Sequence, residues 1–314
     1  MRELAVFFGC DPCYAAVCEA RKSYSPSSLF EKVLSESNIK AVLIDDGFLP
    51  EKSRGIKWHS KYVEARRILR IEKLAQDALL ISPSFDTFES IFSSRLKNES
   101  LSAAALKTVA AYRCGLEIKN YPLKAVRESF LSVKRSGGRI VEAPLISFLL
   151  RLAAKNAIEN DIPLQIHTGF GDSDLSLFRS DPALLKNFIE DGKNRGLKIV
   201  LLHAGYPYVK SAGWMASIYG DVYVDIGLAV MYLSVRGIIS MLHELMELCP
   251  LNKIIYSSDA HFAAELYYLG AKSARQALCE VFLECCIRGE LSAEEALYEA
   301  RGILYENGMK LYRM

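Results

Sequence analysis

The sequence lacks any long hydrophobic run. No apolar stretch approaches the roughly 18 residues of a membrane-spanning helix, and the start, MRELAVFFGCD, has too short an apolar core for a signal peptide. Histidine is scarce, with 5 residues in a chain of 314, and no predicted strand is followed by GxGxxG. These absences exclude a membrane span and argue against an open dinucleotide-binding sheet.

No excess of charge of either sign is present. The chain has 39 Lys and Arg against 37 Asp and Glu, a net charge of +2, and no basic stripe, so nothing indicates a nucleic-acid partner. The 8 cysteines are scattered, and Cys10-x-x-Cys13 has no second pair at zinc-finger spacing. We therefore expect reduced thiols and a cytoplasmic protein.

What the chain does have is a regular alternation of strand and helix patterns. Strands that alternate with helices indicate a parallel sheet with crossover helices. The even spacing favours a TIM-type (β/α)8 barrel, incomplete because only seven strands are recognisable, in one domain over residues 1–314 that ends in C-terminal helices. Residues 83–103 are predicted to form a peripheral helix and loop. The predicted strands are 41–47, 68–72, 105–112, 164–172, 198–203, 222–226 and 254–256.

Three of these strands end in residues that ligate metals: His167 in QIHTGFGD, His203 in LLHAGYP and Asp259 in YSSDAH. The carboxyl ends of parallel strands share one rim, where barrels bind ligands. A single buried histidine is more often a hydrogen-bonded core residue, and Asp259 alone could cap the next helix. Three such residues on one rim favour a metal site for Zn²⁺, or for Mn²⁺ or Fe²⁺. Such an ion would activate water and polarise an amide or carboxyl oxygen.

IPLQIHTGFGD, LLHAGYPY, VYVDIGLA and KIIYSSDAHFAAELYYLGAKSAR resemble the amidohydrolase-related proteins of the metal-dependent hydrolase superfamily. The likeness is to the amidohydrolase-like domain of the FluG and nodulin–glutamine-synthetase type, and it covers most of residues 1–290. It implies a barrel with one or two metal ions at the C-terminal rim, bound by His167 and Asp259. His203 would bind metal or steer the attacking water, from which Asp259 would take a proton.

One feature of that family is missing from this chain. Its members begin the barrel with a strand that ends in His-x-His, whereas this chain has no His-x-His and its first histidine is His59. The segment MRELAVFFGCDP matches the part of relatives that comes after their first strand and helix. The simplest interpretation is a chain without that strand, which accounts for the count of seven and leaves the family's metal set two ligands short.

Lys107 lies where a lysine bridges two metals as a carbamate in some relatives. The alternative is an ion pair with one of three carboxylates, Asp45, Asp46 or Glu142.

Arg70 and Arg113 follow strands on the same rim, and a guanidinium binds a carboxylate with two parallel hydrogen bonds. They favour a substrate with a carboxylate, such as a γ-glutamyl compound, although pairing with Glu72, Asp45 or Asp46 is equally open. Further candidates for substrate binding are Asp46, His261 and His59, the last on a predicted loop.

The sequence thus supports two classes of function. The first is a metal-dependent hydrolase of an amide, C–N or carboxyl group, for which a non-oxidative decarboxylase is the variant. The second is a catalytically impaired barrel that serves as a binding or regulatory partner of a glutamine synthetase-like protein. An exposed sheet edge could also pair two copies into a homo-oligomer.

Overall fold

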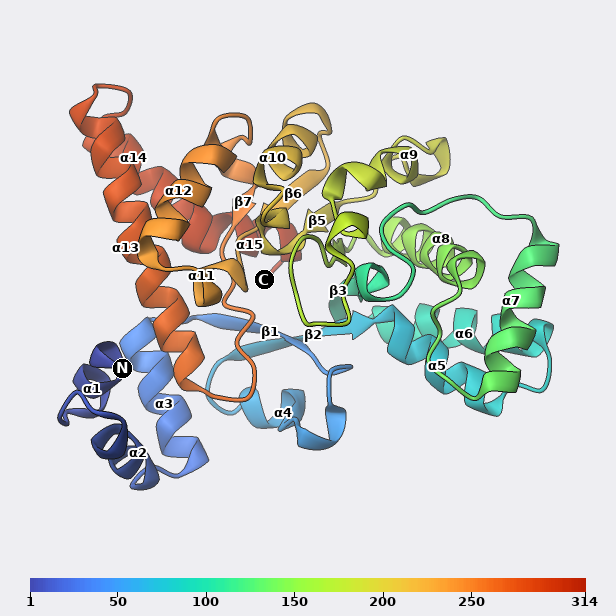
Figure 1. The fold of residues 1–314 in the computed structure, drawn as a ribbon, viewed down its shortest axis with the longest axis horizontal. Coiled ribbons are helices and arrows are strands. Elements are labelled where there is room, and N and C mark those ends of the chain that lie inside the picture. Colours follow the sequence, from blue (N-terminus) through green and yellow to red (C-terminus); the bar gives the residue numbers. More distant parts are fainter.

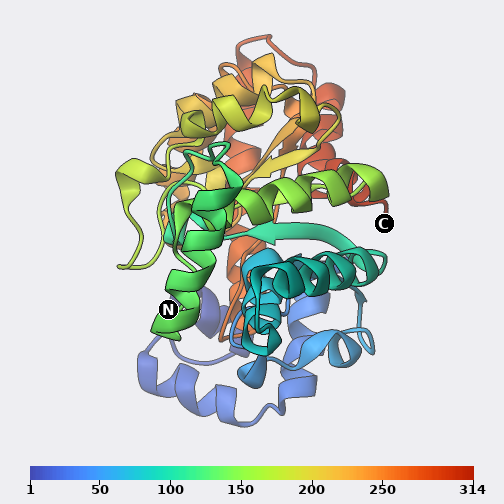
Figure 2. The ribbon, with the colours of Figure 1, turned by 90° about the vertical axis from the view of Figure 1, so that its right-hand side faces the viewer.

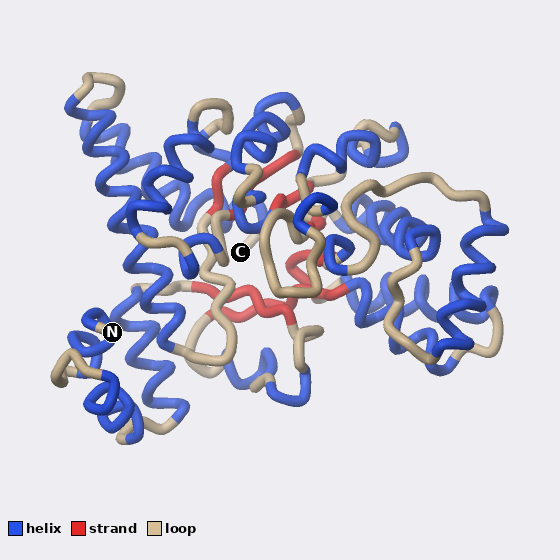
Figure 3. Tube along the Cα trace, in the orientation of Figure 1, coloured by secondary structure: helices blue, strands red, loops and turns tan.

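A computed structural model describes residues 1–314. Its seven strands form one parallel sheet in which the spatial order follows the chain. As predicted, the sheet curls into a TIM barrel that is incomplete. It is incomplete because β1 and β7 do not pair with each other. Figure 3 shows the strands at the centre with helices around them. The strands are β1 (Ala41–Asp45), β2 (Glu64–Arg70), β3 (Ala103–Thr108), β4 (Leu164–Ile166), β5 (Ile199–Leu201), β6 (Val222–Asp225) and β7 (Ile254–Ile255).

Helices cover the outside of the sheet (Figure 1). The N-terminal helices lie at the opposite end of the molecule from α10 and α12 (Figure 2). The helices are α1 (Arg2–Phe8), α2 (Tyr14–Lys22), α3 (Pro26–Ser37), α4 (Gly55–His59), α5 (Ile71–Ile81), α6 (Phe85–Ser100), α7 (Leu123–Ser136), α8 (Ala143–Asn160), α9 (Lys186–Ile189), α10 (Val209–Ile218), α11 (Ala229–Tyr232), α12 (Val235–Met246), α13 (Glu265–Ile287), α14 (Ala293–Arg301) and α15 (Asn307–Tyr312). None of them combines the length and the hydropathy needed to cross a lipid bilayer.

The main core lies between the sheet and its helices, as expected for strands buried on both faces. A second, smaller cluster fills the inside of the curled sheet. There, inward-facing residues such as Ile68 and Val200 pack against Leu311 and Tyr312 of α15. The last helix of the chain therefore closes the amino-terminal side of the barrel interior.

All seven predicted strands end earlier than expected, and two of them show the reason. The apolar run at residues 68–72 continues past the strand, so that Ile71 and Glu72 already belong to α5. Likewise, Ala110–Tyr112 form a short 3-10 turn instead of the end of β3. Hydrophobicity continues across both junctions because strand and helix bury the same side of the chain, and periodicity alone cannot locate the boundary.

The helix predicted within residues 83–103 is present as α6, but it packs more closely than a peripheral element would. Phe88 and Phe92 of α6 are fully buried, and Phe88 packs against Phe130 of α7.

The two outer edges of the sheet differ. The edge of β7 is covered by the C-terminal segment, because Tyr256 N donates to Ile303 O at 2.9 Å and Asn307 Nδ2 donates to Ile254 O at 2.8 Å. The backbone of 41–44 makes no hydrogen bond beyond its pairing with β2. The gap in the barrel is therefore an open strand edge on the β1 side only.

Candidate functional site

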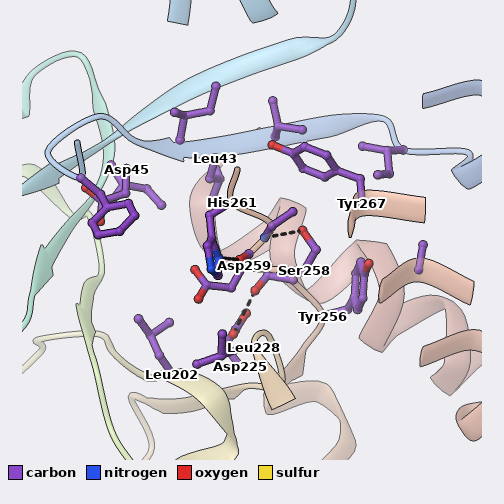
Figure 4. A pocket seen from close by; sticks show the side chains of 18 of the residues that line it. Leu43, Asp45, Leu202, Asp225, Leu228, Tyr256, Ser258, Asp259, His261 and Tyr267 are labelled. Carbon is purple, nitrogen blue, oxygen red and sulfur yellow. Dashed lines mark hydrogen bonds between the residues drawn. The ribbon is translucent and has the colours of Figure 1, made fainter. Parts of the chain in front are cut away.

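The candidate site lies in a cavity of about 1670 Å³ that takes in the carboxyl ends of the strands and continues along β1 to the C-terminal helices. Figure 4 shows Asp225, Asp259 and His261 grouped inside it, with Leu43 and Asp45 of β1 on the far wall. The ionisable side chains that line it include Lys107, Arg113, His167, His203, Asp225 and Asp259. The structure thus brings the three predicted strand-end residues to one cavity.

Two imidazoles face each other in this cavity. His167 follows β4 and His203 lies just beyond β5, and these strands pair in parallel, so the two residues leave the sheet side by side. His203 Nε2 lies 3.0 Å from His167 Nδ1. The outer nitrogen of each ring contacts a backbone carbonyl. His203 Nδ1 is 3.2 Å from Gly227 O, and His167 Nε2 is 3.0 Å from Phe170 O.

The number of protons on this pair is limited. A carbonyl oxygen only accepts, so an outer nitrogen that makes its hydrogen bond does so as the donor. Two neutral imidazoles carry two N–H protons for three contacts, and when both protons lie on the outer nitrogens, the two facing nitrogens are left with lone pairs. Burial lowers the pKa of His203 to about 3 and that of His167 well below its usual value, and the positive charge of Lys107 acts in the same direction, so a third proton is disfavoured. Two converging lone pairs are an arrangement that a cation stabilises.

Asp259 lies close to this pair. Its negative charge acts to raise the pKa of His167, against the larger lowering by burial. It does not cap the following helix, because α13 begins at Glu265 with Ala264 as its N-cap. His261 stabilises the turn by donating from Nδ1 to Asp259 O at 2.9 Å. The carboxylate of Asp259 is left facing the cavity.

Strained backbone is concentrated at the strand ends that build the site. His203, Leu228 and Asp259 have φ values of 68°, 57° and 52°, a region that L-residues rarely adopt. They follow β5, β6 and β7 in turn. Such strain costs on the order of 1–3 kcal/mol per residue and is typical of functional sites.

The sequence reasoning missed Asp225, the last residue of β6. It is buried, and its Oδ1 accepts from Gly227 N at 2.8 Å and from Ser257 Oγ at 3.0 Å. Burial raises its pKa to about 7, although the Ser257 hydrogen bond opposes the change. The signal was present, because Asp225 ends an apolar run just as His167 does.

Lys107 and Arg70 both pair with Asp45, one of the alternatives that the sequence left open for each. Lys107 Nζ lies 3.2 Å from Asp45 Oδ2, and Arg70 donates to both oxygens of the same carboxylate. Burial acts to raise the pKa of Asp45, but the two cations outweigh it and hold that pKa below its ordinary value. Neither cation is free for a substrate in this arrangement.

Arg113 is different. Its Nε and Nη1 are buried without a hydrogen-bond partner, and the residue lines the cavity. A buried guanidinium without an acceptor is costly, which indicates that an anion belongs beside it.

Of two other candidates, Asp46 lies outside the cavity and His59 lies on its wall. Asp46 pairs with Arg67 at 2.7 Å and does not line the cavity. His59 ends α4, not a loop as predicted, and lines the wall, where Nδ1 donates to Gly55 O at 2.7 Å. His243 lies on α12 beside Glu284, 3.3 Å away, and does not line the cavity.

The donor set fits a divalent ion in part. Two imidazole nitrogens on one tetrahedral Zn²⁺ lie about 3.3 Å apart, close to the 3.0 Å between the facing nitrogens. The two outer N–H groups donate to carbonyls, which is the usual support of histidine ligands. No three His, Cys, Asp or Glu side chains, however, come together in a group that could hold a metal ion. The pair supplies two ligands, and Asp259 would have to move to supply a third.

Comparison with known proteins shows the class to which this half-barrel belongs. The amidohydrolase family model matches residues 135–314, so the chain belongs to the amidohydrolase family. It is 29% identical over 319 residues to Protein fluG of Emericella nidulans. That alignment covers 91% of this chain but 36% of the fungal protein, so the chain spans about a third of its curated relative.

Solved structures agree on the fold. A Lactobacillus casei protein, provisionally described as a metal-dependent hydrolase, is similar with a TM-score of 0.89 and 28% identity over 99% of this chain and 82% of that chain. A uronate isomerase of Thermotoga maritima is similar with a TM-score of 0.71 over 98% of this chain and 76% of that chain. At 15% identity, the isomerase shows a shared fold only.

Proposed function

We propose that this chain is a metal-dependent hydrolase that cleaves an amide or related C–N bond of a small substrate bearing a carboxylate. The observation that carries the proposal is the convergence of two imidazole nitrogens, 3.0 Å apart, in the rim cavity. Membership of the amidohydrolase family and similarity to a protein described as a metal-dependent hydrolase support the same class. We place the reaction in the cytoplasm, in keeping with eight free cysteines.

His167 would hold the ion through Nδ1 and His203 through Nε2, with Asp259 as the third donor. Zn²⁺ suits this set, and Mn²⁺ or Fe²⁺ are the alternatives. When bound, the ion supplies a Lewis acid that polarises the substrate oxygen and lowers the pKa of water. Lys107 is not assigned as a ligand while it pairs with Asp45.

Asp259 is the general base of the proposal. In the reaction, water adds to the carbonyl carbon and the C–N bond breaks. Asp259 takes the proton that the water loses and returns it to the departing nitrogen. It suits this role because it lines the cavity, and its only hydrogen bond given by the structure runs from His261 to its backbone oxygen, not to its carboxylate.

Arg113 determines the substrate class in this proposal. Its unpartnered Nε and Nη1 would bind the carboxylate of the substrate through two parallel hydrogen bonds. Arg70 has its guanidinium on Asp45 and would support the cavity wall instead. Compounds with a carboxylate and an amide, such as γ-glutamyl amides, carry both groups that the site would recognise.

Metal titration tests the proposal. The purified chain is expected to bind about one Zn²⁺, and His167→Ala is expected to weaken binding at least about 100-fold, more than loss of a supporting residue would. His243→Ala, on the surface of α12, is the matched control and should bind as the wild type does. A chain that binds far less than one ion, whether Zn²⁺, Mn²⁺ or Fe²⁺, would remove the proposal. A non-oxidative decarboxylase would pass this test and be identified by CO₂ release.

A second function, in which the barrel is a binding or regulatory partner, is favoured by two observations. The outer edge of β1 is unpaired, and the site has no group of three ligands. An unpaired strand edge readily pairs with another chain, either a second copy or a glutamine synthetase-like protein. Sedimentation of the chain alone and with such a protein tests this, and a strictly solitary monomer in both experiments would contradict it.

A further inference from the structure

The backbone turn that follows β6 directs a carbonyl at His203. Gly227 O accepts from His203 Nδ1 at 3.2 Å and from Ala229 N at 2.6 Å. Leu228 lies between them with φ 57° and ψ −51°, the values of a γ-turn of the rare, strained kind. A leucine is held in this conformation only if its surroundings determine the turn strongly.

Asp225 and Ser257 hold the turn in this conformation. Asp225 Oδ1 accepts from Gly227 N at 2.8 Å and from Ser257 Oγ at 3.0 Å, and the carboxyl group is buried. On the next peptide, Leu228 N donates to Ser258 O at 3.3 Å. The turn is therefore fixed on both sides of its carbonyl.

The turn is closely packed at Gly227. A Cβ on Gly227 would lie 2.0 Å from Ser257 Oγ and 2.7 Å from Asp225 Oδ1, so a larger residue there would displace the two side chains that hold the turn. This close packing lets the carboxyl group of Asp225 accept a hydrogen bond directly from the backbone of the turn.

We propose that Asp225, together with Ser257, is a positioning residue that fixes the Gly227–Ala229 turn and so keeps the proton of His203 on Nδ1. The inference rests on the proposed function, because its purpose is to leave Nε2 of His203 free for a divalent ion. Neutral imidazole carries one N–H, and the partner of one nitrogen decides which nitrogen bears it. If the Gly227 carbonyl turned away, the proton could move to Nε2 and block the side that faces His167.

The test compares two truncations of buried carboxyl groups. Asp225→Ala removes the anchor of the turn. Glu72→Ala is the matched control, because Glu72 is equally buried and likewise accepts from a hydroxyl, Thr108 Oγ1 at 2.5 Å, and a backbone amide, Val109 N at 3.0 Å. Glu72 does not line the cavity. Asp225→Asn keeps an acceptor oxygen and should restore the wild-type tautomer and Zn²⁺ affinity. Ser257→Ala is a milder change that serves if Asp225→Ala does not fold.

Two measurements are made on each variant. The ¹⁵N shifts of the His203 ring in metal-free protein report the tautomer, and competition with a chelator reports Zn²⁺ affinity. We expect Nδ1–H in the wild type, Asp225→Asn and Glu72→Ala, and a shift toward Nε2–H in Asp225→Ala. Zn²⁺ affinity is expected to fall about 10- to 100-fold in Asp225→Ala, the usual effect of losing support behind a ligand, and less in Ser257→Ala.

The outcomes separate the two claims. Equal tautomers and equal Zn²⁺ affinities in Asp225→Ala and Glu72→Ala would overturn the role of Asp225. If Asp225→Ala does not fold, the same equality between Ser257→Ala and the wild type would overturn it. A wild type that binds no Zn²⁺ but whose His203 tautomer still changes in Asp225→Ala would remove the proposed function and leave the positioning role standing.

Discussion

Gln165 in the middle of β4 donates a hydrogen bond from Nε2 to the hydroxyl of Tyr312, 2.8 Å away, and both residues are buried. The contact joins the barrel interior to the last helix, 147 residues later in the chain. Since α15 closes one side of the interior, this contact bears on the stability of the whole half-barrel.

Tyr312→Phe is expected to lower the free energy of unfolding by about 1–3 kcal/mol, because it leaves the amide of Gln165 buried without a partner. Urea unfolding followed by circular dichroism measures the change. Tyr298→Phe on α14, where the side chain is 67% exposed, is the control and should change stability little. Equal stabilities for the two variants would show that the interior contact is unimportant.

Arg113→Lys is expected to raise KM for carboxylate-bearing amides with a smaller effect on kcat. A lysine supplies one point charge in place of a fork of donors, and losing charge-assisted hydrogen bonds worth about 1.5–3 kcal/mol corresponds to a change of about 10- to 150-fold. Steady-state kinetics on γ-glutamyl amides measures it. Arg139→Lys is the control, because Arg139 also lines the cavity but pairs with Asp174 at 2.9 Å. If both variants behave alike, Arg113 does not bind the carboxylate.

Lys107→Met is expected to destabilise the protein by about 1–3 kcal/mol, because Asp45 stays buried with only Arg70 as its partner. Because Lys107 pairs with Asp45 in this structure, we expect the lysine to act as a cation there and not to form a carbamate. Wild-type protein equilibrated with ¹³C-bicarbonate should therefore show no carbamate signal that is lost in Lys107→Met. A carbamate signal that is present in the wild type and absent from Lys107→Met would instead assign Lys107 to a metal bridge.

Metal-free protein is expected to lose stability as the pH falls below about 6.5, and His203 contributes to this. Burial lowers its folded pKa to about 3, from 6.5 in the unfolded chain, so between these values the unfolded state binds more protons. Stability therefore rises with pH in that window and falls on acidification, by about 1.4 kcal/mol for each pH unit. Urea unfolding from pH 7 to 4 tests this, and His203→Gln should show a shallower slope. An unchanged slope would mean that His203 is not held neutral.

The sequence predicted the parallel half-barrel because periodic burial is a local property. The central strands, such as Leu164–Ile166 of β4, are buried on both faces and read as short, mainly apolar runs. The convergence of His167, His203 and Asp259 followed from the same rule, since parallel strands end at one rim. Boundaries were less accurate, as at Ile71 and Glu72, where one apolar run serves both a strand and a helix.

Only the tertiary structure decided how the polar groups are paired. Arg70 and Arg113 occupy similar places in sequence, yet one is bound to Asp45 and the other has no partner. The reason is that a hydrogen bond depends on distances of a few tenths of an ångström between residues far apart in the chain. The sequence by itself determined which residues reach the rim. Only the folded backbone placed the carbonyl of Gly227 beside Nδ1 of His203, 3.2 Å away.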